Sequence, residues 1–291
     1  MKKVLICILG SIVLLAGMSL ACYPFFSNYL ISQNHDSEIG SQQVAVEKME
    51  EVDIENVLKN AEIYNKSLLG NVVLTDPFDP GFEAETDIDY EYQLNINNDS
   101  MMANIEIPIL SIKLPIYHGT SQNTLLKGIG HLQKTSLPIG GKGTHAVLTG
   151  HTGLSIASMF TDIDKLKLDD VFYIHVLNKT LAYKVDQIKV VKPSQTEDLR
   201  IDTDEDYVTL VTCTPYGVNT HRLLVRGTRI PYEEAEQLLE GATPVESTWM
   251  VEYRNALIAG AVALVLVITA FIIIKTIRSK RRNNSELESE E

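Results

Sequence analysis

The sequence predicts a mostly β domain, an antiparallel barrel or sandwich with short helical insertions, that lies outside a membrane between two hydrophobic spans. Three observations support this prediction. Short runs rich in Val, Ile, Tyr, Thr and Leu recur between residues 104 and 230, and Gly, Pro, Asn and Asp bound them. Two runs of 19 residues without a charge lie near the two ends of the chain. An amphipathic stretch separates the first run from the β-rich part.

The two charge-free runs are Val4–Cys22 and Ala256–Ile274. At about 1.5 Å per residue, each spans roughly 28 Å as a helix, close to the hydrocarbon thickness of a bilayer. We expect the second run to cross the membrane. We expect the first to be a retained anchor, with a cleaved signal peptide as the alternative, because Ser19–Ala21 offers a small-residue cleavage site. Lipoprotein processing at Cys22 is disfavoured, since Ser19 stands where that signal usually has Leu.

Basic residues set the expected orientation of the chain. Lys2 and Lys3 precede the first run, and the second run is followed by Lys275, Arg278, Lys280, Arg281 and Arg282. The positive-inside rule then puts both termini in the cytoplasm and the middle domain outside the cell. The final stretch, Ser285–Glu291, is acidic and is expected to be disordered.

The chain is expected to divide into six parts. Residues 1–27 form the membrane anchor or signal segment, 28–98 a linker, amphipathic helix and loop, 99–240 the β domain, 241–255 a linker, 256–274 the C-terminal transmembrane helix and 275–291 a cytoplasmic tail. Within the second part, residues 28–43 are polar and predict a linker. Apolar positions from Val44 to Leu69 roughly follow helical spacing, which predicts one or two helices packed on the main domain. A loop is predicted next, because prolines and a glycine interrupt Asp76–Gly81.

Seven strands are expected within the β domain. They span Asn104–Ile107, Ile112–Tyr117, His145–Thr149, Val171–Val176, Thr180–Val191, Tyr207–Thr212 and Arg222–Ile230. Short helical patches are expected at Asn123–Lys127 and Met159–Leu166, and a further short helix is expected at Pro231–Gly241.

Charge and motif content exclude several classes of function. The net charge of −13 argues against a nucleic-acid partner, which would require a basic surface, and is typical of a soluble surface. The glycine-rich stretch Gly140–Thr144 is not a phosphate loop, because Lys142 precedes a glycine rather than Ser or Thr. The sequence contains neither Gly-x-Ser-x-Gly nor His-Glu-x-x-His, so serine-hydrolase and zinc-protease functions lack support.

Cys213 is the only cysteine outside the first apolar run, which contains Cys7 and Cys22. It therefore cannot form a disulfide within the β domain, and a lone thiol in an oxidising space is either a reactive group or a buried inert cysteine. A β run ends at Cys213 and a Pro/Gly turn follows, which places the thiol beside a loop where a substrate can reach it.

A nucleophilic cysteine needs a basic partner and a cationic neighbour, because the thiolate is the attacking form and a free thiol has a pKa near about 8.5. Arg222 opens the next strand nine residues downstream, so an antiparallel return can bring its guanidinium beside the thiol. His151 is the best candidate for the basic partner, since it follows a predicted strand and glycines lie on either side. By composition alone, the rivals are His131, His145 and His221; strand alternation turns the last of these to the opposite face from Arg222.

Taken together, these motifs closely resemble those of the sortase family. The Thr209–Cys213 segment carries the resemblance most specifically, together with Arg222 downstream and Thr149–His151 upstream. Further similar segments are Ile105–Ile109, Leu114–Gly119, Gly128–Leu132 and Ser136–Pro138. The resemblance covers residues 45 to 275, and the set as a whole is similar to class C, the pilin-polymerising branch.

The resemblance implies an eight-stranded β-barrel and a cysteine transpeptidase. Cys213 would be the nucleophile, His151 would protonate the leaving amine, and Arg222 would bind the substrate backbone or the developing oxyanion. Class C enzymes carry a lid with an Asp and an aromatic residue, which Asp76 and Phe78 match; Asp76 would pair with Arg222 and Phe78 would cover Cys213. A second, C-terminal span is also common in that branch, and Ala256–Ile274 fits it.

The implied partners are the membrane and pilin subunits or surface proteins with an LPxTG-like sorting signal. The enzyme would cleave this signal between Thr and Gly and transfer the acyl group to a pilin lysine. No metal or organic cofactor is implied. Two alternatives remain open. One is a housekeeping sortase that attaches proteins to the cell wall, and the other is a non-catalytic, membrane-tethered assembly or adhesion protein with an inert Cys213.

Overall fold

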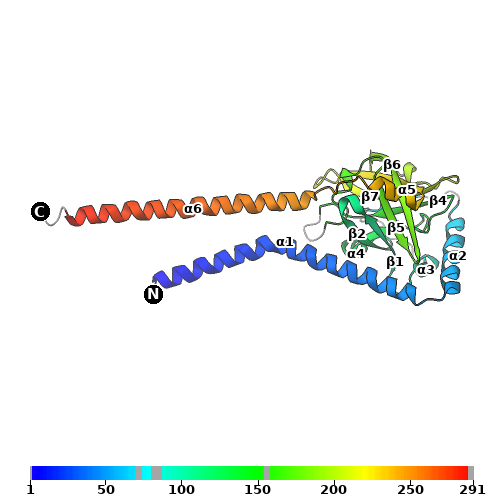
Figure 1. Ribbon diagram of the computed structural model, residues 1–291, viewed down its shortest axis with the longest axis horizontal. Helices are drawn as coiled ribbons and strands as arrows, with labels where there is room; N and C mark the ends of the chain where they lie inside the picture. The colour runs from blue at the N-terminus through cyan, green and yellow to red at the C-terminus, as the bar shows by residue number, and fades with distance from the viewer. Residues whose placement is uncertain (1, 70–73, 80–86, 154–157, 288–291) are drawn as a thin grey trace. The chain divides into compact units, whose positions relative to one another are not determined.

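The computed structural model describes residues 2–69, 74–79, 87–153 and 158–287, which form two compact units, Met1–Val245 and Glu246–Glu291. The first unit contains a closed barrel with the strand order β1-β2-β3-β4-β7-β8-β6-β5 (Figure 1). The strands are β1 Met101–Ile107, β2 Ile112–His118, β3 Ile129–His131, β4 Thr144–Thr149, β5 Val171–Val176, β6 Lys179–Val191, β7 Asp206–Thr214 and β8 His221–Ile230.

The barrel is mixed rather than antiparallel throughout. β2 pairs with β3 and β4 pairs with β7 in parallel, while the other neighbouring strands are antiparallel. The parallel β2–β3 pair follows from a helical crossover, because α4 Gln122–Lys127 carries the chain back before β3 begins. The expectation of a wholly antiparallel sheet was wrong in these two places, since strand runs in a sequence do not state their direction.

The strand that the sequence pattern missed is β3, which has only three residues. Its middle residue, Gly130, pairs with Tyr117 on one side and Thr149 on the other. A Cβ at this position would lie 2.4 Å from the carbonyl oxygen of Gly119, so only glycine fits. A run this short, with a glycine at its centre, carries too little periodicity to be recognised. The helix expected at Met159–Leu166 is likewise reduced to one 3₁₀ turn, Ile163–Lys165.

Large apolar side chains from every wall fill the barrel interior. Ile105, Ile116, Leu210 and Val225 are completely buried there. The rings of Phe172 and Tyr183 stack at 5.6 Å between centroids. Burying such a cluster supplies the main favourable free energy of the fold, at roughly 25 cal/mol per Å² of apolar surface.

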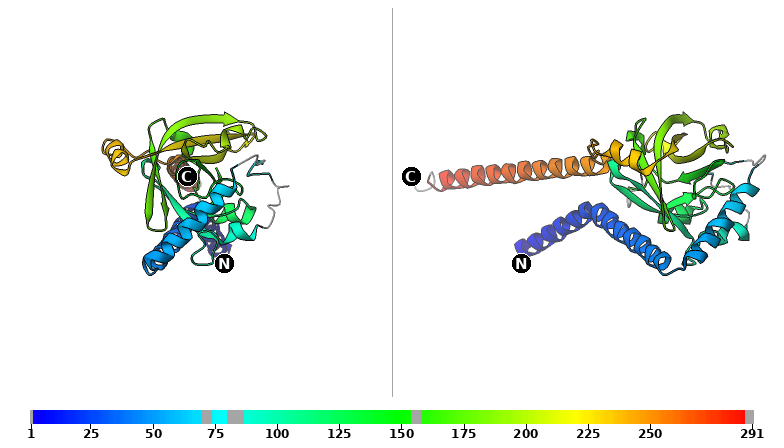
Figure 2. Two further views of the ribbon diagram at one scale, coloured as in Figure 1. Left: turned by 90° about the vertical axis from the view of Figure 1, so that its right-hand side faces the viewer. Right: turned by 45° about the vertical axis from the view of Figure 1, so that its right-hand side comes forward.

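The N-terminal segment differs from the expectation of a linker at residues 28–43. Helix α1 runs without a break over Lys2–Glu47, with Pro24 inside it, and then α2 occupies Glu51–Ser67 (Figure 2). The polar residues after Asn28 form a helix because one side of it packs on the barrel. There the Gln42 amide donates to the carbonyl of Met101 at 3.1 Å, and Ile39 packs with Met101 and Tyr117.

Two buried polar side chains attach the segments that flank residues 70–86 to the barrel. Asn65, near the end of α2, accepts from the backbone N–H of Leu137 at 2.7 Å and donates to its carbonyl. Tyr90, in α3 Ile88–Tyr92, is 3% exposed, and its hydroxyl donates to the carbonyl of His131 at 3.1 Å. The chain between these anchors therefore starts and ends at defined places on the barrel.

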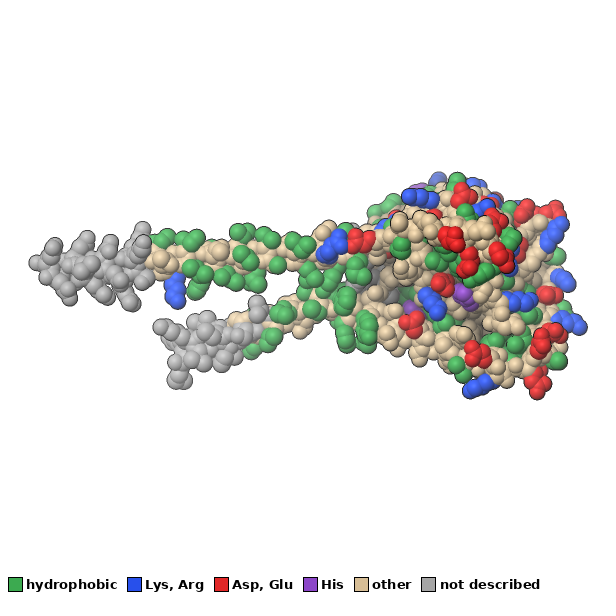
Figure 3. Space-filling model, in the orientation of Figure 1, with side chains coloured by type: hydrophobic (Ala, Val, Ile, Leu, Met, Phe, Trp, Pro, Cys, Tyr) green, Lys and Arg blue, Asp and Glu red, His purple; other side chains and the backbone are tan. Residues whose placement is uncertain are grey.

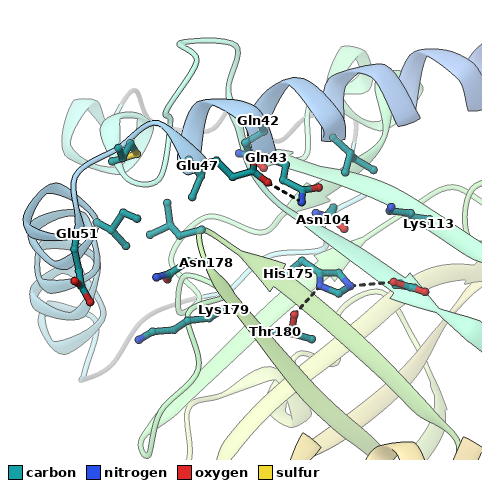
Figure 4. A pocket seen from close by; sticks show the side chains of 16 residues that line it. Gln42, Gln43, Glu47, Glu51, Asn104, Lys113, His175, Asn178, Lys179 and Thr180 are labelled. Atoms are coloured by element: carbon teal, nitrogen blue, oxygen red, sulfur yellow. Dashed lines mark hydrogen bonds and ion pairs between the residues drawn. The ribbon is translucent and has the colours of Figure 1, made fainter.

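A groove of about 620 Å³ lies between the end of α1, the start of α2 and the outer face of β1 and β5 (Figure 4). Gln42, Asn104 and His175 are among the side chains that line it, and His175 pairs with Glu106 at 3.0 Å. In the strand order, β1 is four strands away from β7 in either direction, so this groove lies across the barrel from Cys213.

The first unit also contains the short helix α5 Tyr232–Leu239, and the second contains α6 Thr248–Leu287. Within α6, Tyr253–Ile277 has a mean hydropathy of 3.1 and is long and apolar enough to cross a membrane. Hydrophobic side chains cover the described length of this stretch and are exposed (Figure 3). This stretch contains the run Ala256–Ile274.

Candidate active site

Cys213 and Arg222 lie directly opposite each other in the antiparallel β7–β8 ladder. Side chains of such a pair leave the same face of the sheet with Cβ atoms about 4.5–5.5 Å apart. The short connection expected from the sequence therefore does bring the thiol and the guanidinium together. The Cys213 side chain is partly accessible, whereas Arg222 is 8% exposed.

His151 reaches the same place through the parallel β4–β7 pair. Thr149 is the register partner of Val211, and the chain then continues alongside β7. The N–H of Gly150 donates to the carbonyl of Val211 at 3.1 Å, and the hydroxyl of Thr212 donates to the carbonyl of Gly150 at 2.7 Å. These two bonds hold the residue before His151 against the residues before Cys213.

Gly150 is required by the crowding beneath His151. A Cβ at this position would lie 2.7 Å from the ring of Phe160 and from the side chain of Ile129. Any larger residue would push the His151 loop away from β7, and the imidazole would move with it.

Asp76 forms a bidentate ion pair with Arg222. The guanidinium donates to the two carboxylate oxygens at 2.8 and 2.6 Å, and both side chains are about nine-tenths buried. Paired planar hydrogen bonds of this kind are the strong form of an arginine–carboxylate contact. The Asp76–Arg222 pair expected from the family resemblance is thus present.

The Phe78 ring is close to both His151 and Arg222. Its ring centroid is 5.7 Å from that of His151 and 5.1 Å from the guanidinium carbon of Arg222. The Nε2 atom of His151 is buried and has no hydrogen-bond partner among the described residues. The segment with Asp76 and Phe78 therefore occupies the space between His151 and Arg222. A substrate would need that same space.

A small apolar cluster continues the site along the outer face of the barrel. It consists of Leu132, Val147, Leu199, Val211 and Leu224, with Leu74 and Phe78 packed against it. Val211 and Leu224 lie two residues from Cys213 and Arg222 on their strands, so all four share one face. The carbonyl of Leu74 also accepts from the hydroxyl of Thr196 at 3.4 Å. Leu74 and Phe78 thus cover an apolar surface that adjoins the thiol.

Burial changes the protonation of both candidate catalytic groups. It lowers the pKa of His151 and raises the pKa of the Cys213 thiol. For the thiol, Arg222 opposes this shift while Asp76 adds to it. All the shifts except that from Arg222 favour the neutral thiol and neutral imidazole over the thiolate and imidazolium.

The burial, hydrogen bonds and strand positions of the other candidate histidines account for them as structural residues. His131 is fully buried and bonds to the carbonyl of Ser136 at 2.8 Å, and burial lowers its pKa to about 4. His145 bonds to the carbonyl of Arg200 and to the hydroxyl of Thr209, and burial lowers its pKa to about 4 as well. His221 precedes Arg222 on β8 and therefore points to the other face.

Two features of this site were not singled out from the sequence. Thr212 lies inside the Thr209–Cys213 motif, but its bond to Gly150 depends on a partner 62 residues away. Leu74 lies two residues before Asp76 and could have been found as the apolar neighbour of that motif. Among the described residues, no group of three His, Cys, Asp or Glu side chains is placed to hold a metal ion.

Comparisons with known proteins agree with this geometry. The model of the Sortase domain family matches residues 105–230. Sortase C1 of GBS Pilus Island 1 is 44% identical, with 68% of this chain and 93% of that chain covered and a TM-score of 0.61. Sortase C-1 from Actinomyces oris is 50% identical, with 61% and 99% covered and a TM-score of 0.58. Sortase A of Bacillus anthracis is 25% identical over 55% of this chain and 89% of its own length.

The chain belongs to the sortase family, in its class C branch. Sortases are cysteine transpeptidases, so this sortase is an enzyme of that type. The barrel that this sortase forms is the closed eight-stranded fold that the motif resemblance implies.

Proposed function

We propose that this sortase cleaves an LPxTG-like sorting signal between Thr and Gly, with Cys213 as the nucleophile, and transfers the acyl group to a lysine of a pilin. The main support for the roles of the residues is the register that puts Cys213 opposite Arg222, together with the Thr212–Gly150 bond that holds the His151 loop beside them. Asp76 and Phe78 act as the lid of the site in this proposal.

In the first half-reaction, the Cys213 thiolate attacks the carbonyl carbon of the Thr–Gly bond. Arg222 donates hydrogen bonds to the developing oxyanion or to the substrate backbone. The His151 imidazolium gives its proton to the leaving glycine nitrogen, the C–N bond breaks, and a thioester remains on Cys213. Because Asp76 engages Arg222 in this structure, the lid must first release the guanidinium.

In the second half-reaction, a neutral amine attacks the thioester carbonyl. His151, now neutral, takes the proton from the attacking nitrogen, the C–S bond breaks, and the thiolate is restored. With a lysine amine as the acceptor, the product is an isopeptide bond between two subunits. These steps use only groups of this chain and of its substrates.

A pilin lysine is favoured over a cell-wall amine as the acceptor for two reasons. The Asp76–Arg222 pair and the ring of Phe78 match the lid of the class C branch. The structures compared above include a sortase from a pilus island. The alternative, a housekeeping sortase that attaches proteins to the wall, is supported by the likeness to Sortase A of Bacillus anthracis, at lower identity.

We further propose that the chain is a membrane protein with the barrel outside the cell and both termini in the cytoplasm. The apolar stretch Tyr253–Ile277 supports the C-terminal span. The charge-free run Val4–Cys22 supports a second, N-terminal span, and the basic residues beyond both runs support the orientation.

The proposal is tested by trapping the acyl enzyme. The full chain is incubated with an LPxTG peptide and examined by mass spectrometry, first without an amine and then with a pilin subunit or a wall-peptide amine. We expect an adduct on Cys213 that only the pilin resolves into a covalent conjugate; Cys213→Ala forms no adduct. Resolution by the wall amine alone would identify the housekeeping function. A Cys213 that stays unmodified in the wild type and also in Asp76→Asn, which weakens the lid contact, would indicate a non-catalytic protein.

Arg222→Lys has a matched control on the same strand. Arg226 also forms a bidentate pair, with Asp186 at 3.0 and 2.6 Å, but it lies four residues further along β8. A lysine cannot reproduce the planar fork of donors. Arg222→Lys should therefore lower kcat/KM for peptide cleavage by about 10²–10³, and Arg226→Lys should leave it near the wild-type value. Equal losses in both variants would contradict the role of Arg222.

A further inference from the structure

Four aromatic side chains follow the first charge-free run on α1. They are Tyr23, Phe25, Phe26 and Tyr29, and each is more than half exposed. Their helix continues directly from Cys22, where that run ends. Tyr23 and Tyr29 are of the kind that gathers at the level of the lipid headgroups in membrane proteins, because the tyrosine ring is amphipathic. Their position on α1 therefore marks where the helix leaves the hydrocarbon.

The barrel is attached to α1 within the same two turns. The Asn28 side chain accepts from the backbone N–H of Ser158 at 3.1 Å, and Ile31 packs against the barrel core. Asn28 is six residues beyond Cys22, which is about 9 Å along an α-helix. The headgroup layer on one side of a bilayer is roughly 5–8 Å thick. The contact of Asn28 with the barrel thus falls at the outer edge of that layer.

The other connection to a membrane span leaves from the same corner of the barrel. The N–H of Val245, the last residue of the first unit, donates to the carbonyl of Ile109 at 2.7 Å. Ile109 belongs to η1, the 3₁₀ turn Pro108–Leu110 between β1 and β2. The apolar stretch of α6 begins at Tyr253, eight residues later, and eight extended residues reach at most about 28 Å.

A cavity of about 300 Å³ lies between the first attachment point and the chain directly after η1. One wall is the part of α1 that includes Asn28 and His35, and the opposite wall consists of Ser111–Leu114, directly after η1, with Ser158 and Met159. The α1 contact and the Val245 contact are therefore both at the η1 end of the barrel.

Strand direction identifies what else lies at that end. β1 runs into η1, and β5 starts beside it, because Glu106 pairs with Tyr173 in antiparallel register. The turn before β5, residues 167–170, is therefore at the η1 end, and it presents Leu168, which is 59% exposed. The turn between β5 and β6 is at the other end, roughly 20 Å away along the strand.

We propose that the η1 end of the barrel, with Ser158 and the turn at residues 167–170, rests on the lipid headgroups of the membrane that the chain spans. Tyr23, Phe25, Phe26 and Tyr29 lie in the interface between water and hydrocarbon. This inference rests on the proposed N-terminal span and is independent of the proposed chemistry.

The orientation has a consequence for the substrate. The loop after β4 carries His151 toward this end, where the N–H of Phe160 donates to the His151 carbonyl at 3.0 Å, two residues after Ser158. Because β7 runs parallel to β4, Cys213 lies on the same side. The candidate active site therefore opens close to the membrane surface, and an acyl donor held in the same membrane reaches it without a long extended segment.

A fluorescence experiment tests the orientation in the intact chain. The only tryptophan, Trp249, is replaced by Phe, and single tryptophans are introduced in Leu168→Trp and Lys179→Trp. Leu168 lies in the turn before β5, and Lys179, the first residue of β6, pairs with Val176 at the end of β5, so these exposed positions lie near opposite ends of β5. Each variant is placed in phosphatidylcholine nanodiscs with and without a lipid that carries a nitroxide quencher on its headgroup.

We expect several-fold stronger quenching for Leu168→Trp than for Lys179→Trp. Equal quenching of the two, or no quenching of either, would overturn the proposal, because the barrel would then lie on its side or stand away from the lipid. Lys167→Trp serves as a second probe of the same turn if Leu168→Trp does not fold. The outcome does not depend on acyl transfer, so it is separate from the test of the proposed function.

Discussion

Asp76 acts on the site in two ways, because its carboxylate binds the Arg222 guanidinium and also places a negative charge near the Cys213 thiol. Phe78 adds a barrier between His151 and Arg222. A reacting peptide bond requires the opposite state, in which the guanidinium is free and the thiol is ionised. Under the proposed lid role, the contacts of Asp76 and Phe78 describe a resting enzyme in which burial favours the neutral forms of the Cys213 thiol and the His151 imidazole.

We predict that Asp76→Asn increases the reactivity of Cys213 at neutral pH. Burial is the largest cause that raises the thiol pKa, and the Asp76 charge adds to it, while Arg222 lowers it. Removing the carboxylate weakens the lid contact and deletes the negative charge, so the pKa falls and more thiolate is present at pH 7. The measurement is the rate of iodoacetamide labelling as a function of pH.

Glu106→Gln is the control for that experiment. It removes a carboxylate from an ion pair with His175, but on β1, across the barrel from Cys213. We expect its labelling profile to match the wild type. An unchanged profile in Asp76→Asn would remove the lid role while leaving the catalytic proposal intact.

At the scale of secondary-structure elements, the site is the place where three strand ends meet. β7 supplies Cys213, β8 supplies Arg222, and the loop after β4 supplies His151. The β7–β8 contact is fixed by a ladder of backbone bonds, but His151 lies two residues beyond its strand. Its position depends on the two bonds of Gly150 to β7, and one of those is made by the Thr212 side chain.

We predict that Thr212→Val lowers the rate of acylation by about tenfold, which corresponds to about 1.4 kcal/mol of barrier. Valine keeps the shape but leaves the Gly150 carbonyl without its donor, so the imidazole loses its position. Thr212→Ser, which keeps the hydroxyl, should restore the rate. Both variants are assayed by the burst of glycine-peptide release.

The control for Thr212→Val is on the same strand. Thr209 is 1% exposed and its hydroxyl bonds to His145, so Thr209→Val also removes a buried hydrogen bond. Each Val variant is expected to lose about 1–3 kcal/mol of stability. If acylation falls to the same extent in both, the effect of Thr212 is stability rather than position.

At the scale of the whole molecule, buried histidines make the barrel sensitive to acid. His131 and His145 have pKa values of about 4, below the ordinary value of 6.5, because burial disfavours the charged form. Between pH 4 and 6.5 the unfolded chain binds more protons at these positions than the folded chain. The contribution of these two histidines to the free energy of unfolding is therefore fully present above pH 6.5 and is lost progressively as the pH falls toward 4.

We predict that the thermal midpoint of the detergent-solubilised chain falls by several degrees between pH 7.5 and pH 5, as followed by near-UV circular dichroism. His145→Gln should unfold at a lower temperature than the wild type at pH 7.5, yet lose less of its midpoint between the two pH values. An equal pH dependence in the variant would show that other groups account for the acid sensitivity.

The sequence alone was sufficient for the local features of this protein. Short runs rich in Val, Ile, Tyr, Thr and Leu predicted seven of the eight strands, because each strand buries one face or both and its residue types reflect that burial. The run Ala256–Ile274 and the motif around Cys213 were also evident, since length, hydropathy and residue spacing are properties of a continuous segment. The pairing of Cys213 with Arg222 followed from the same argument, because only a short return separates the two residues.

Tertiary structure decided the features that depend on residues distant in the chain. Residues 28–43 are helical because the barrel supplies a surface for one side of α1, and a polar sequence does not reveal that surface. Three-residue β3 exists only because β2 and β4 pair with it on both sides. The two parallel pairings, the Thr212–Gly150 bond and the closed Asp76–Arg222 contact likewise join segments that sequence separates by up to 146 residues. Short-range patterns record which face of an element is buried, whereas the partner that buries it is set only when the chain packs.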